Sequence, residues 1–241
     1  MSQPLFNTFG ILGIPITHFI TIFIPVIIIT KLLKKNYKQV FFLNKPEKPL
    51  YIFTGIALWF GALIISAIFA AFALKFLPEE KELLNAFDYI FSNTVLWQQV
   101  LLIGLMPAIT EELLFRGFIF SAFLKNISPA MAIIISSAMF AAMHLSLLKF
   151  VPTFLLGVVF AYTVYKTKSL YSSMLLHFIN NTFSVIVQSL IPNVDIPQAY
   201  ILPGVNVQII VVLLVMIVLI IFNKVNSVNL KIEKQKSILK R

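Results

Sequence analysis

The stretch TEELLFRG at residues 110–117 places three ionisable side chains inside a long apolar segment. VLLIGLMPAI precedes this stretch and FIFSAFL follows it, so Glu111, Glu112 and Arg116 fall where the chain could cross a membrane. A charged side chain at the centre of a bilayer costs at least about 2.5–3.5 kcal/mol. Such residues normally face the protein interior, and we therefore expect each of the three to have a partner there.

Helical spacing separates the two glutamates. Glu112 and Arg116 are four residues apart, so on a helix they lie on one face and can form an ion pair. Glu111 points about 100° away from Glu112 and about 140° away from Arg116. The arginine is badly placed to neutralise Glu111, which therefore needs a partner from another helix.

The three histidines of the chain all lie in apolar segments. His18 has no ionisable neighbour in the sequence, and we interpret it as structural. His144 occurs in AMFAAMHLS, and His177 in MLLHFINNTF, where it shares a helix face with Asn181. A glutamate, two histidines and an amide can activate a water molecule, either as general base and oxyanion stabilisers or around a metal ion.

The composition indicates a polytopic membrane protein. Of the 241 residues, 59% are hydrophobic and 12% are charged, whereas a soluble domain would carry about a quarter charged residues. The spans are continuously apolar and lack the alternation of a barrel strand, which predicts an all-α transmembrane bundle of about seven to eight helices. The expected spans are roughly 9–32, 50–76, 94–124, 129–148, 150–166, 169–192 and 205–223.

The net charge of +10 suits a membrane protein with basic cytoplasmic loops. The lysines gather at 31–38, at 166–168 and in the tail, which predicts an external N-terminus and a cytoplasmic C-terminus. The first span precedes its lysines, so we expect it to remain as an anchor. No basic patch is interleaved with aromatic residues, and a nucleic-acid partner is not expected. The absence of cysteine excludes thiol chemistry.

Three motifs carry a resemblance to a known family. EELLFRG, FAAMH and HFINN, in that order, resemble the pattern of the CAAX prenyl protease and bacteriocin-processing (CPBP) family of intramembrane proteases, also called the Abi family. The resemblance covers about residues 95–190. It implies a helical membrane fold with the catalytic site in a cavity within the bilayer.

The same resemblance implies residue roles. Glu111 would polarise the attacking water with the help of His144, and His177 and Asn181 would stabilise the oxyanion. The other motif residues would support these groups, namely Glu112, Arg116 and Phe140. A zinc ion at Glu111, His144 and His177 and a metal-free glutamate mechanism are both open under this resemblance.

The expected organisation has accessory helices in 1–93, a protease core in 94–192, and a last helix with a basic tail in 193–241. The expected function is hydrolysis of a peptide bond near the membrane surface, in leader peptides, lipidated peptides or other membrane-associated substrates. The expected location is a bacterial cell membrane. Two alternatives stay open: an inactive scaffold or bacteriocin self-immunity protein of the same fold, and a proton-relay transporter, for which no inverted repeat is visible. The sequence does not predict the oligomeric state.

Overall fold

The described part of the chain is entirely helical. A computed structural model describes residues 12–73, 75–76 and 94–190, and these residues contain no strand. The first part holds α2 (Gly13–His18), η2 (Phe19–Phe23), α3 (Ile24–Leu32), α4 (Tyr37–Val40) and α5 (Leu50–Ala73). The second part holds α7 (Leu96–Gln99), η3 (Val100–Leu105), α8 (Met106–Glu112), η4 (Leu113–Ile119), α9 (Phe120–Phe123), α10 (Pro129–Ala142), α11 (Leu147–Thr167) and α12 (Leu170–Leu190). The predicted all-α fold is confirmed.

Among the residues that the structure describes, four helical runs are long and apolar enough to cross a membrane: Pro15–Leu32, Leu50–Ala73, Leu147–Thr167 and Leu170–Leu190. The outer faces of these runs expose large apolar side chains, such as Phe53 at 69% and Ile68 at 67% on α5. A soluble surface would not carry such a continuous apolar face, and the protein is an integral membrane protein. The predicted span 205–223, the basic tail and residues 77–93, between the second and third predicted spans, lie outside the described residues.

The predicted third span is one continuous helical run from Leu96 to Phe123 in which α and π geometry alternate. Both glutamates lie at the end of α8, between the π-helices η3 and η4. Pro107 has no N–H to donate to the carbonyl four residues earlier, which belongs to Ile103. The side chain of Asn181 on α12 donates to that carbonyl instead, with Nδ2 2.9 Å from the oxygen.

The predicted boundary of the fourth span was wrong. We expected a helix over 129–148, but α10 ends at Ala142 and α11 begins at Leu147. Leu145 has a φ of 51°, which interrupts the helix. The side chain of Ser146 then accepts a hydrogen bond from the Lys149 backbone N–H and caps the new helix. His144 therefore lies in the turn between two helices.

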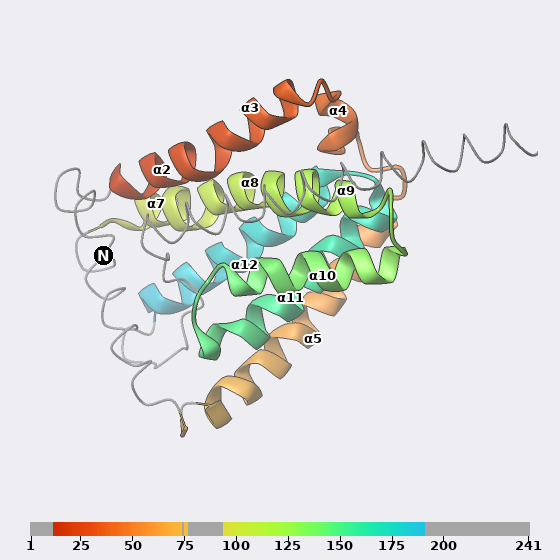
Figure 1. The fold of residues 1–241 in the computed structure, drawn as a ribbon. Coiled ribbons are helices and arrows are strands. Elements are labelled where there is room, and N and C mark those ends of the chain that lie inside the picture. Colours follow the sequence, from red (N-terminus) through yellow and green to blue (C-terminus); the bar gives the residue numbers. More distant parts are fainter. Residues whose placement is uncertain (1–11, 74, 77–93, 191–241) are drawn as a thin grey trace, which may run out of the picture.

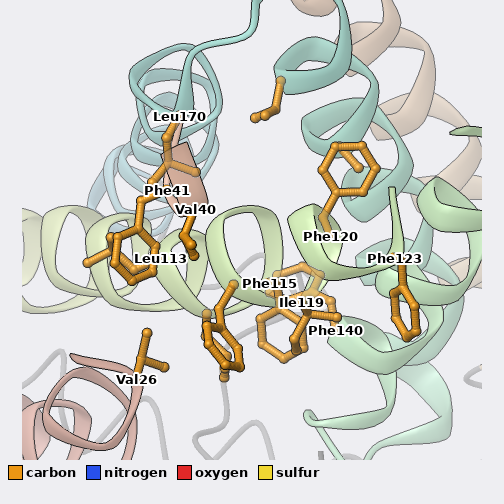
Figure 2. Close-up of a cluster of buried hydrophobic side chains, with 14 of the residues drawn as sticks. Val26, Val40, Phe41, Leu113, Phe115, Ile119, Phe120, Phe123, Phe140 and Leu170 are labelled. Carbon is orange, nitrogen blue, oxygen red and sulfur yellow. The ribbon is translucent and has the colours of Figure 1, made fainter. Parts of the chain in front are cut away.

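The helices pack around α11, which contacts α10, α5 and α12, while the first helical run lies along α8 and η4 (Figure 1). Gly157 allows the close approach of α10, because a Cβ at this position would lie 2.9 Å from the Ser137 Cβ. The buried aromatic side chains Phe115 and Phe140, from η4 and α10, meet in the core beside Ile119 (Figure 2). The helix carrying the glutamates is thus enclosed by other helices.

We expect Gly157→Ala to lower stability, because the added methyl group would press on the Ser137 backbone and separate α10 from α11. Overpacking of this kind costs about 1–3 kcal/mol. Gly61→Ala is the matched control, since nothing lies within 4 Å of a Cβ built there. Thermal unfolding in detergent measures both variants, and an unfolding temperature equal to that of the wild type for Gly157→Ala would contradict the packing described.

Candidate active site

Arg116 is the charged centre of the core. Its Nη1 lies 2.7 Å from Oε1 of Glu112, and neither side chain is exposed. Its Nη2 donates to the Gly157 carbonyl oxygen at 3.3 Å. The guanidinium carbon also lies 4.2 Å from the ring centroid of Phe140, which gives a favourable cation–π contact. The ion pair predicted from the spacing is confirmed, and Glu111 is not part of it.

His177 lies between the two glutamates. Its Nδ1 is 2.9 Å from Oε1 of Glu112. A carboxylate paired with an arginine only accepts hydrogen bonds, so Nδ1 carries the hydrogen. Its Nε2 is 3.9 Å from Oε2 of Glu111, which is too long for a direct hydrogen bond. The Phe160 ring stacks on the imidazole with centroids 5.0 Å apart. The ring is therefore fixed with Nε2 facing Glu111.

His144 is hydrogen-bonded to the last turn of α10, the helix that precedes it. Its Nδ1 lies 2.9 Å from the Phe140 carbonyl oxygen, so Nδ1 donates and the neutral ring keeps its lone pair on Nε2. In the described part of the chain, no hydrogen bond or ion pair joins His144 to Glu111. The Phe140 ring is nearly perpendicular to both imidazoles, and its centroid lies 5.1 Å from that of His144 and 5.9 Å from that of His177. Phe140 thus contacts both rings as well as the guanidinium.

Asn181 is part of a buried chain of hydrogen bonds. Trp59 on α5 donates from Nε1 to Oδ1 of Asn180 at 2.9 Å. Asn180 in turn donates to Oδ1 of Asn181 at 3.1 Å. The Asn181 amide nitrogen has two N–H groups, and one of them serves the Ile103 carbonyl. The amide is therefore rigidly oriented one turn after His177.

His18 contacts the helix of the glutamates, which the sequence did not indicate. Its Nδ1 lies 2.9 Å from Oγ1 of Thr110, the residue before Glu111. His18 and Thr110 are 92 positions apart, so no local spacing predicts their contact. Thr110 is polar but not ionisable, and the contact forms because the first helix packs on α8 at this point.

The donor set proposed for zinc does not converge in this structure. Within residues 12–73, 75–76 and 94–190, no three histidine or acidic side chains lie close enough together to hold a metal ion. Glu111 and His177 approach each other, but among the described residues no hydrogen bond or ion pair joins His144 to either of them. In this arrangement the three side chains do not form a metal-binding group.

Part of the chain matches a known protein family. Residues 92–183 match the family described as "Type II CAAX prenyl endopeptidase Rce1-like". This range includes all three motifs that suggested the resemblance, and it leaves the first helices outside. Comparisons with curated proteins and with solved structures gave no match.

We expect Arg116→Met to destabilise the protein strongly. It would leave the carboxylate of Glu112 buried without its cation, and breaking such a pair costs about 3–5 kcal/mol. The double variant Glu112→Gln/Arg116→Met should recover most of this loss, because the neutral amide oxygen still accepts from His177. Unfolding in detergent gives the comparison. A double variant no more stable than Arg116→Met would show that the buried charge is not the cause.

Proposed function

We propose that this protein, whose residues 92–183 belong to the CAAX prenyl protease and bacteriocin-processing family, is an intramembrane endopeptidase. The observation that carries the proposal is the unequal use of the two glutamates. Glu112 is ion-paired with Arg116 and hydrogen-bonded to His177. Among the described residues Glu111 has no such partner, and its Oε2 lies 3.9 Å from the Nε2 of His177. Glu111 is 5% exposed and free of Arg116, which leaves its carboxylate available to a substrate.

In the proposed reaction Glu111 acts as general base. Its carboxylate takes a proton from water while the water oxygen attacks the carbon of a peptide carbonyl. The Phe140 carbonyl binds only the Nδ1 of His144. The Nε2 of His144 would accept a hydrogen bond from the same water. Glu111 then returns the proton to the leaving nitrogen as the C–N bond breaks, giving a carboxylic acid and an amine.

The charge on the tetrahedral oxygen needs fixed donors. We assign this role to the Nε2 of His177 in its protonated form and to the second N–H of Asn181. Both groups are already oriented in the free protein, by Glu112 and by the Ile103 carbonyl. Donors of this kind stabilise a transition state because they need no reorganisation during the reaction.

The proposed substrates are peptides that lie in or on the membrane, including lipidated C-terminal peptides and leader peptides. The buried position of Glu111 among apolar helices supports this class, since a soluble peptide would not reach it readily. A bacterial cell membrane with a cytoplasmic C-terminus remains our proposal for the location. It rests on the lysine distribution of the sequence.

We predict that Glu111→Gln lowers peptide cleavage by about 10²–10⁴-fold, the usual contribution of a general base. The change is isosteric, so the unfolding temperature in detergent should stay close to that of the wild type. Cleavage is measured by mass spectrometry of membrane peptides incubated with each variant in detergent micelles or liposomes. Equal cleavage by the wild type and by Glu111→Gln would show that Glu111 is not the general base. A wild type that cleaves nothing would favour the scaffold or immunity alternative.

The metal-free form of the mechanism gives a separate prediction. Purified active protein should hold well below one zinc ion per chain by elemental analysis, and 1,10-phenanthroline should leave the cleavage rate unchanged. The physical reason is the separation of the three expected donors. Stoichiometric zinc that is lost together with activity would establish the metal-dependent form instead.

A further inference from the structure

The packing of the fold does not explain the Nε2 nitrogen of His18. Thr110 donates its hydroxyl hydrogen to the Met106 carbonyl oxygen at 2.9 Å, so Oγ1 offers only lone pairs to His18. The Nδ1 of His18 must therefore carry the hydrogen of the 2.9 Å contact. In the neutral ring, this leaves Nε2 as a hydrogen-bond acceptor.

The Nε2 atom is buried and has no hydrogen-bond partner among the described residues. His18 itself is 0% exposed. Buried polar atoms are nearly always hydrogen-bonded in native proteins, and an unmade bond there is costly. An apolar side chain would fill the same space without that cost, so packing alone does not account for a histidine.

The position of His18 relates this nitrogen to the candidate site. His18 is hydrogen-bonded to Thr110, the residue that precedes Glu111. It is also the last residue of α2, immediately before the π-helix η2. Short π-helical turns within α-helices are frequent at functional sites.

We propose that His18 is a substrate-binding residue of the site, whose Nε2 accepts a hydrogen bond from a backbone N–H of the bound peptide. The nitrogen only accepts, so the ligand group must be a donor, which excludes carboxylate and phosphate groups. A peptide in extended form offers N–H groups on both sides of the bond that is cut. This inference rests on the proposed function and adds the first helix to the peptide-binding residues.

The test uses the inactive Glu111→Gln background, so that binding is measured without hydrolysis. The probe is a fluorescent S-farnesyl heptapeptide in detergent micelles. His18→Phe removes the acceptor and keeps a ring of similar size. We expect its affinity to fall about three- to tenfold, the effect of one neutral hydrogen bond. His18→Gln, which retains an acceptor oxygen, should recover part of the affinity.

A set of peptides N-methylated at one amide each identifies the donor. For one member of the set, the affinities of the parent protein and of the His18→Phe variant should become equal, since the methyl group has already removed the hydrogen bond. Equal affinities for the unmethylated peptide, including no binding by either protein, contradict the inference. A similar loss for every member of the set, with no position singled out, also contradicts it.

Stability separates a binding role from a structural one. His18→Phe should unfold close to the temperature of the parent, because loss of the Nδ1 hydrogen bond to Thr110 is offset by removal of an unsatisfied buried acceptor, and Thr110 keeps its bond to Met106. A clear fall in the unfolding temperature overturns the inference. Cleavage by the chain with native Glu111 is measured in parallel, so that a failure of the endopeptidase proposal is recognised apart from a failure of the His18 inference.

Discussion

The buried pair of Glu112 and Arg116 is the interaction on which the rest of the site depends. An unpaired charge at this depth would be too costly to keep, and the 2.7 Å contact neutralises both groups. The bound carboxylate then fixes which nitrogen of His177 carries hydrogen and which faces Glu111. One residue along the chain, Glu111 is turned away from the cation by helical geometry. The pair therefore gives two adjacent glutamates different chemical surroundings.

Part of this site could be predicted from the sequence because it is local. The spacing of four residues specified the ion pair, and the angle between adjacent helical residues left Glu111 unpaired. The all-α membrane fold followed from continuous apolar spans. The contacts between helices could not be predicted in the same way. Spacing indicated that Glu111 needs a partner from another helix, but it did not show that His177 places one ring nitrogen on Glu112 and the other toward Glu111.

The misplaced end of α10 has a similar cause. The segment 129–148 is apolar throughout except for a few small polar residues, so hydropathy gives no sign of a break. The helix ends because Leu145 adopts a positive φ and Ser146 caps the following helix. His144 was therefore predicted to lie within a helix, whereas its Nδ1 binds the last turn of α10 from outside. The contact of His18 with Thr110 spans 92 positions and follows only from the packing of the first helix.

The hydrogen bond from Asn181 to the Ile103 carbonyl has a consequence for how the chain enters the membrane. In lipid, a carbonyl without a partner is costly, and Pro107 removes the donor that an ordinary helix would provide. The missing donor is supplied 78 positions later in the chain, by α12. One hydrogen bond to the backbone of the helix that carries the two glutamates is thus made by α12, so it can form only after α12 has joined the bundle.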